Sequence, residues 1–201
     1  MVKNTISKAA VIGCSIGDKI AEDIVGKLNL SKESSIILIP HICAKSIHDY
    51  LLEKGKKVYP ILNNQIIEPQ SIYVGMENPT DLLNSDNYYG LRRKLIIKKD
   101  NGEYKFFLGE EEGRYIDAAF VAVANAFKDK SIGVILDGMG GSGIEGTTKI
   151  KEVGGTTLVQ TVDKRNPQFE VSMPYLVIHK GKVDYILPPD KLCTKLEEML
   201  R

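Results

Sequence analysis

The sequence has few cysteines and no long apolar run. Its 201 residues include three cysteines, Cys14, Cys43 and Cys193, and none has Cys-X-X-Cys spacing. This sparse, odd set favours reduced thiols in a cytoplasmic protein over a disulfide framework or a zinc site. No run approaches the roughly 20 apolar residues that cross a bilayer, and residues 1–5 show no signal-peptide pattern. We therefore expect a cytoplasmic protein with no membrane insertion and no bound metal.

The chain also lacks an excess of charge of either sign. Lysine and arginine number 27 against 26 for aspartate and glutamate, so the formal net charge is +1. Nucleic acids and anionic membranes attract basic proteins, so this balance argues against both as partners. Apolar residues make up 43% of the chain, which is enough to bury one continuous core. We expect a single domain over residues 1–201.

Four apolar runs rich in Val and Ile predict strands that are buried on both faces, because they do not alternate with polar residues. The runs cover residues 9–12, 36–39, 133–136 and 157–159. Segments 20–28, 47–51 and 116–127 have the apolar spacing of helices. Since strands and helices alternate, the sequence predicts an α/β fold with a mostly parallel sheet and crossover helices.

Two segments depart from this alternation. Within 77–113, an apolar stretch and an aromatic stretch flank Asp100-Asn101-Gly102, which predicts a β-hairpin insertion. The hairpin carries basic and acidic flanks, which are typical of a protected sheet edge and leave a role in shaping a substrate groove less favoured. Residues 175–178 fit a short helix between Pro174 and Gly181 and fit a strand equally well.

A serine lies in a tight turn between the first predicted strand and the helix after it. The segment Gly13-Cys14-Ser15-Ile16-Gly17 has the Gly-X-Ser-X-Gly spacing of a nucleophile elbow. The glycines allow a sharp turn that exposes the hydroxyl, and the next amide lies at a helix N-terminus, where negative charge is favoured. The pattern makes Ser15 a candidate nucleophile, although any tight strand-to-helix turn favours the same residues.

Two more candidates end predicted strands. His41 follows the second strand and Asp137 follows the third. The carboxyl ends of parallel strands share one edge of a sheet, where ligand crevices form. His41 can then act as the base for Ser15, and Asp137 can orient the imidazole. His48, inside a predicted helix, and His179, beside a predicted turn, are expected at the surface.

The loop after the third strand supports a competing interpretation. Residues 138–143 fit the Gly-X-Gly-X-X-Gly pattern between a strand and a helix, and Asp163 lies 20 residues after Gly143. This arrangement is typical of a dinucleotide site with an acid on the ribose. A dinucleotide site would leave Ser15 and His41 without a role, and both interpretations stay open on the residues alone.

The order of these pieces resembles the catalytic domain of the chemotaxis protein-glutamate methylesterases, the CheB-type receptor demethylases. The matching segments span almost the whole chain: 11–17, the strand ending at His41, 69–74, Ile116-Asp117, 133–136 with Gly138-Met139-Gly140, and Met173-Pro174. The resemblance implies a doubly wound, Rossmann-like α/β sheet. It also implies a cofactor-independent serine carboxyl-ester hydrolase that demethylates, and deamidates, side chains of receptor helices.

The resemblance assigns site residues as well. It makes Ser15 the nucleophile and His41 the general base, with the backbone N–H groups of Ile16 and Met139 as the oxyanion hole. Ser142 occupies the place of the triad aspartate. A hydroxyl accepts the imidazole N–H but supplies no charge, and such a replacement typically removes about 10⁴ from turnover. Asp137 can substitute only if its side chain points toward His41.

Two other departures concern the surroundings of the site. Asp18 replaces a glycine of the family; a carboxylate there favours the helix start, whereas beside an oxyanion it would be repulsive. Only residues 1–7 precede the first predicted strand, so we expect no receiver domain; either the domain stands alone or a separate protein regulates it. We therefore predict a methylesterase acting on receptor helices or another protein ester. The alternatives are a catalytically weak relative that serves as a binding module, and a dinucleotide-binding protein.

Overall fold

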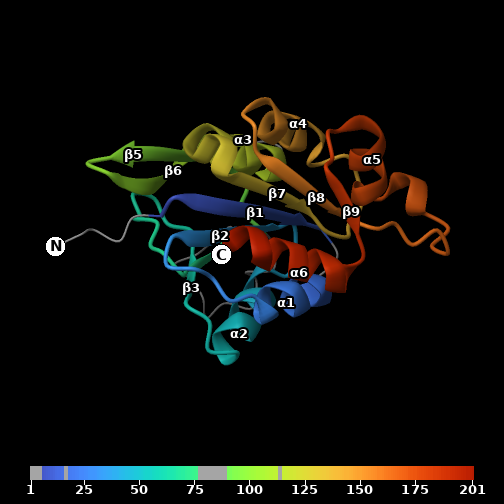
Figure 1. Ribbon diagram of the computed structural model, residues 1–201, viewed down its shortest axis with the longest axis horizontal. Helices are drawn as coiled ribbons and strands as arrows, with labels where there is room; N and C mark the ends of the chain where they lie inside the picture. The colour runs from blue at the N-terminus through green and yellow to red at the C-terminus, as the bar shows by residue number, and fades with distance from the viewer. Residues whose placement is uncertain (1–5, 16–17, 77–89, 113–114) are drawn as a thin grey trace.

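The structure is a computed structural model that describes residues 6–15, 18–76, 90–112 and 115–201. Its centre is a seven-stranded sheet in the order β3-β4-β2-β1-β7-β8-β9, in which every neighbouring pair is parallel (Figure 1). The strands are β1 (Lys8–Cys14), β2 (Ser34–Pro40), β3 (Val58–Pro60), β4 (Ile72–Val74), β7 (Ser131–Ile135), β8 (Thr156–Gln160) and β9 (Tyr185–Leu187). The predicted parallel α/β fold is confirmed.

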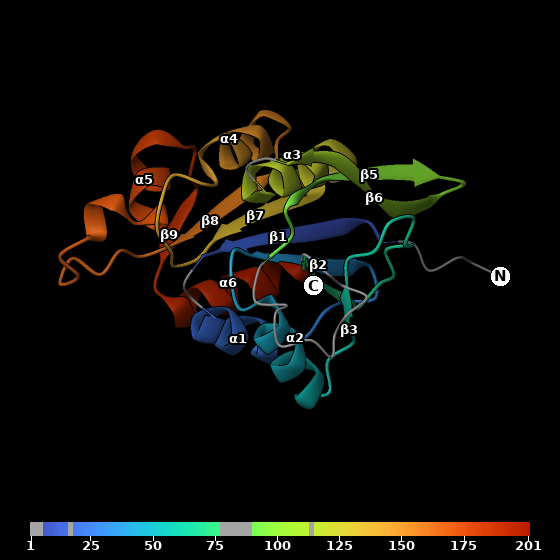
Figure 2. The same cartoon turned by 180° about the vertical axis from the view of Figure 1, so that it is seen from behind.

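Helices cover both faces of this sheet. One face carries α1 (Asp18–Lys27), α2 (Ala44–Glu53) and α6 (Pro189–Leu200), and the other carries α3 (Tyr115–Phe127), α4 (Ile144–Glu152) and α5 (Met173–Lys180) (Figures 1 and 2). In β1, Val11 packs into the core under α3 and α5, whereas Ala10 and Ile12 pack into the core under α1, α2 and α6. Two apolar layers explain why the central strands show no alternation. No helix in the described segments is both long and apolar enough to span a membrane.

The predicted hairpin is formed by β5 (Arg93–Asp100) and β6 (Glu103–Glu112), which pair antiparallel and make a separate two-stranded sheet. Asn101 and Gly102 connect the two strands, both with positive φ (49° and 85°), as a tight hairpin turn requires. Side chains on the inner face, including Phe106, join the core under α3. Part of the predicted insertion, residues 77–89, lies outside the described residues.

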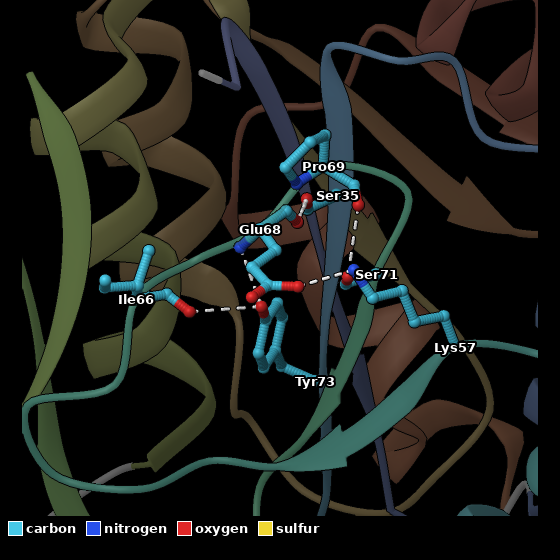
Figure 3. A network of polar contacts seen from close by, with 7 residues as sticks. All are labelled: Ser35, Lys57, Ile66, Glu68, Pro69, Ser71 and Tyr73. Atoms are coloured by element: carbon cyan, nitrogen blue, oxygen red, sulfur yellow. Dashed lines mark hydrogen bonds and ion pairs between the residues drawn. The ribbon is translucent and has the colours of Figure 1, made fainter. Parts of the chain in front are cut away.

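A polar network fastens the chain between β3 and β4 to the sheet (Figure 3). The buried Tyr73 hydroxyl accepts a hydrogen bond from the Glu68 N–H at 2.7 Å and donates one to the Ile66 carbonyl at 3.2 Å. The Ser35 hydroxyl on β2 donates to the Glu68 carbonyl at 2.6 Å. Burial raises the pKa of Tyr73 to about 12. These bonds tie the segment to β2, the strand that leads to His41.

Some local expectations need correction. His48 does lie in a helix, α2, but only 6% of it is exposed, so the expected surface position is wrong. It shares the buried face of α2 with Ala44, Ile47 and Leu51, at helical spacing. His179 is exposed, at the end of α5. The ambiguous segment 175–178 is helical, and the Ser172 hydroxyl caps its helix by accepting from the Tyr175 N–H.

Candidate active site

The candidate site lies at the carboxyl edge of the sheet, where the strand order reverses. The chain passes from β1 to β2 on one side, and β7 to β9 continue the sheet on the other side of β1. Open α/β sheets form their ligand crevices at such a point. A pocket of about 220 Å³ is found there. Its lining comprises Ser15, Ile39, Pro40, His41, Tyr115, Ile116, Met139, Ser142 and Met173.

Ser15 and His41 meet in this pocket. The Ser15 Oγ lies 3.3 Å from the His41 Nδ1. Their proximity follows from the sheet register. Cys14 pairs with Pro40, so the residues that follow them, Ser15 and His41, leave the sheet side by side. The His41 N–H also donates to the Cys14 carbonyl at 2.8 Å. When the ring proton is on Nε2, Nδ1 accepts the proton of the Ser15 hydroxyl, which is the geometry that activates a serine.

A glycine behind His41 holds this residue in place. The Gly90 N–H donates to the His41 carbonyl at 3.0 Å. A Cβ at Gly90 would lie 1.6 Å from the Pro40 carbonyl oxygen, so only glycine allows this approach. Gly90 belongs to the segment before β5, some 50 residues away in sequence, and nothing in its sequence context distinguishes it from other glycines.

The loop after β7 packs directly against the serine. The Ser15 N–H donates to the Asp137 carbonyl at 3.1 Å, and a Cβ at Gly138 would lie 2.4 Å from the Ser15 Cβ. The amides that flank Met139 are engaged, since Gly138 N–H donates to the Asp137 Oδ1 and Gly140 N–H donates to the Val171 carbonyl. Within the described residues, the Met139 N–H makes no hydrogen bond. It is therefore free to bind an oxyanion in the pocket; Ile16, the other predicted donor, lies outside the described residues.

The two candidates for orienting His41 are placed differently. Ser142 lines the pocket together with Ser15 and His41. Asp137 lines a neighbouring small pocket instead, where its Oδ1 accepts from the Gly138 N–H at 2.8 Å. No carboxylate among the described residues hydrogen-bonds to the His41 ring. The structure thus brings Ser15, His41, Met139 and Ser142 together, and this placement gives no support to Asp137. Asp18 begins α1, but its side chain lies outside the described part of the chain.

The loop 138–143 is poorly suited to a dinucleotide. A pyrophosphate would bind the free N–H groups at the start of α4. The Gly143 and Gly146 N–H groups there already donate to the buried Oδ1 of Asp117, at 3.0 Å and 2.8 Å. Asp163, the expected ribose acid, instead makes a bidentate pair with Arg165, whose hydrogen bonds lower the Asp163 pKa to about 2. In the described segments, no group of three or more His, Cys, Asp or Glu side chains is arranged to hold a metal ion.

Comparison with known proteins gives the family of the chain. The family model for CheB methylesterase matches residues 10–196. A putative protein-glutamate methylesterase/protein-glutamine glutaminase of Leptospira interrogans is 31% identical over 193 residues, which cover 92% of this chain and 91% of the relative. A protein-glutamate methylesterase/protein-glutamine glutaminase of Thermotoga maritima is 36% identical over 111 residues, 53% of this chain and 31% of the relative.

The similarity extends to a solved structure. The crystal structure of the Thermotoga maritima CheB methylesterase catalytic domain matches with a TM-score of 0.78 and 26% identity, covering 96% of this chain and 98% of that one. The family match includes both strand ends that carry Ser15 and His41 and the loop that carries Met139. With its sequence, its fold and the order of its pieces in agreement, the chain belongs to the CheB methylesterase family.

Proposed function

We propose that the protein is a serine carboxyl-ester hydrolase of the protein-glutamate methylesterase type. The observation that carries the proposal is the 3.3 Å approach of the Ser15 Oγ to the His41 Nδ1 inside a pocket. The substrate class follows from the names of the relatives, which are protein-glutamate methylesterases and protein-glutamine glutaminases. The substrate in this proposal is a glutamate methyl ester, or a glutamine, on a receptor helix or another protein.

The proposed reaction proceeds through an acyl-enzyme. The Ser15 Oγ attacks the ester carbonyl carbon while His41 takes the hydroxyl proton. The Met139 N–H, with the Ile16 N–H that the family resemblance adds, binds the carbonyl oxygen as it gains negative charge. His41 then returns the proton to the leaving methoxy oxygen, and methanol departs. Water attacks the acyl-enzyme, His41 takes a proton from it, and the Ser15 hydroxyl forms again; with a glutamine substrate, ammonia leaves instead of methanol.

One observation favours a second candidate, a catalytically weak relative that binds the same substrate. The described residues give His41 no carboxylate partner, so the imidazolium formed during the reaction has no adjacent counter-charge. Loss of a triad carboxylate typically lowers turnover by about 10⁴. Such an enzyme still forms an adduct at its serine, whereas a pure binding module does not.

Labelling with a fluorophosphonate separates a protein with a reactive serine from a pure binding module. The Ser15 Oγ would bond to phosphorus and displace fluoride, and intact-mass and peptide analysis would locate the adduct. We expect one adduct, on Ser15, that disappears in Ser15→Ala and forms more slowly in His41→Ala. The matched control is Ser46→Ala, which removes an exposed hydroxyl in α2 and leaves labelling unchanged. Absence of any adduct on the wild-type serine would reject the hydrolase and favour the binding module.

The proposal also includes a cellular setting. None of the three cysteines, Cys14, Cys43 and Cys193, forms a disulfide in the structure, which supports a reducing compartment such as the cytoplasm. A cytoplasmic protein would reach the cytoplasmic helices of chemotaxis receptors, and a separate regulatory protein would control it. Co-purification of the protein with receptor signalling domains would test this setting.

A further inference from the structure

A buried carboxylate links two walls of the candidate pocket. Asp117, in the first turn of α3, is 3% exposed. Its Oδ1 accepts hydrogen bonds from the Gly143 N–H at 3.0 Å and from the Gly146 N–H at 2.8 Å. Both bonds join α3 to the start of α4, across more than 25 residues of sequence. Both distances lie in the ordinary range of N–H···O hydrogen bonds.

Asp117 takes the place of a helix-capping residue. The cap position of α4 is Gly143, in a left-handed conformation (φ 94°), and it has no side chain to bond the free N–H groups of the helix. An ordinary cap accepts from the second or third residue of its helix, and Gly146 is the third residue of α4. The Asp117 carboxylate, which comes from α3, therefore caps the N-terminus of α4, as a local aspartate or serine does in other helices. A carboxylate is also stabilising at this end because it lies at the positive end of the helix dipole.

The same contact fixes the loop that holds the oxyanion donor. Tyr115 and Ile116, just before Asp117, line the pocket, and so does Ser142, just before Gly143. Two hydrogen bonds hold the loop on either side of Met139: the Met173 N–H donates to the Gly138 carbonyl at 2.7 Å, and the Gly140 N–H donates to the Val171 carbonyl at 2.9 Å. Asp117 holds the end of the loop, at Gly143. Loss of the Asp117 bonds would leave Met139 without the attachment at the end of the loop, so that the loop from Gly141 to Gly143 could shift and carry the Met139 N–H with it.

A close approach of α3 and α4 makes the bond possible. A Cβ at Gly146 would lie 2.5 Å from the Phe120 Cβ, so the glycine lets α4 come near enough for Asp117 to reach it. The second carboxylate oxygen, Oδ2, is buried and has no hydrogen-bond partner among the described residues. Burial of such an atom costs stability. The two hydrogen bonds of Oδ1, which fix the position of the loop, offset that cost.

We propose that Asp117 is a positioning residue for the esterase site. It holds the 138–142 loop so that the Met139 N–H faces the carbonyl oxygen of a substrate bound at Ser15. The inference rests on the proposed function, because it assigns Asp117 a part in the same reaction. Asp117 itself does not contact the reacting atoms.

The test measures fluorophosphonate inactivation of the folded protein, separated into the affinity for the reagent and the rate constant of the bonded step. Asp117→Leu and Asp117→Ala remove both hydrogen bonds, and Asp117→Asn keeps an oxygen that accepts them. We expect the rate constant to fall about 10- to 100-fold in the first two, less than for outright loss of an oxyanion donor. We expect the affinity to stay the same and the asparagine variant to recover most of the rate.

A matched control separates positioning from stability. Asp184 also accepts a backbone N–H through its carboxylate, from Thr157 at 2.8 Å, but it lies at the amino edge of β8 and β9, away from the pocket. Asp184→Ala should lower the urea midpoint and leave the rate constant unchanged. All variants are measured in sucrose, which favours the folded state.

Three outcomes would overturn the inference: a wild-type rate constant in folded Asp117→Leu, an equal loss in Asp184→Ala, or failure of both the leucine and alanine variants to fold in sucrose. The last would show that Asp117 serves folding alone. The proposed function fails separately, if wild-type Ser15 does not react at all.

Discussion

The Ser142→Asp variant would supply the charge that the candidate site lacks. Ser142 lines the pocket with His41, and no described carboxylate bonds to the His41 ring. Proton transfer from Ser15 makes His41 positive, and a carboxylate at position 142 would stabilise that positive charge in the transition state. We therefore expect Ser142→Asp to raise kcat rather than to lower KM, since the interaction forms only as the reaction proceeds.

The size of the gain follows from the exposure of the site. Two unit charges about 4 Å apart attract by about 4 kcal/mol at an effective dielectric of 20 and by about 1 kcal/mol in water. His41 is exposed and the neighbouring Ser15 is nearly buried. The attraction between His41 and an aspartate at position 142 should therefore have an energy between these limits. This range corresponds to a rate increase of roughly 5-fold to 10³-fold. The full factor of about 10⁴ associated with a triad carboxylate is the upper bound.

The assay is the release of methanol from a peptide that carries a glutamate methyl ester. The matched control is Ser142→Asn, which has nearly the shape of aspartate without its charge. We expect the aspartate variant alone to gain rate, with a gain that shrinks as salt screens the exposed charges. The pH midpoint of kcat should also move upward, because a nearby carboxylate raises the pKa of an imidazole. Equal rates in the aspartate and asparagine variants would refute the reasoning.

Three other predictions concern the surroundings of the site. Because the pKa of Tyr73 is raised to about 12, its contribution to the unfolding free energy should be constant below pH 10, where the unfolded tyrosine is still protonated, and should fall by roughly 3 kcal/mol between pH 10 and 12. Urea titrations should show that Tyr73→Phe lacks this decrease. Gly90→Ala forces its Cβ onto the Pro40 carbonyl and should slow Ser15 labelling by about 10²-fold, whereas Gly109→Ala, with ordinary contacts, should not. NAD and NADP should leave the melting temperature unchanged; a rise that grows with nucleotide concentration would show that the loop 138–143 binds them.

The central strands could be predicted because burial on both faces leaves a direct trace in the sequence. Residues 9–12 of β1 are wholly buried between two helix layers, and an unbroken apolar run is the only pattern compatible with that position. The strands β3, β4 and β9 have three residues each, too few for any periodicity to appear. In α6, Leu192, Leu196 and Leu200 are buried at helical spacing, so the sequence does contain a signal for this helix.

The residues of the site also fall into those that the sequence predicts and those that it does not. Ser15 and His41 are predictable because each ends a strand and adjacent parallel strands deliver their ends to one edge. The roles of Gly90 and Asp117 are not predictable from the residues, although Asp117 belongs to a segment that carries the family resemblance, because both roles come from approaches between segments far apart in sequence. His48 shows a related failure: a polar residue on the apolar face of α2 is buried by the packing of its neighbours.

The small volume of the pocket bears on the proposed substrate. Ser15 is nearly buried, and the pocket that it lines is about 220 Å³, below the roughly 300 to 1,000 Å³ that encloses a drug-sized molecule. In the proposed function, the side chain that carries the ester would enter this space. Under that proposal we expect the length of the side chain to distinguish esters, because an aspartyl side chain is one methylene shorter than a glutamyl side chain.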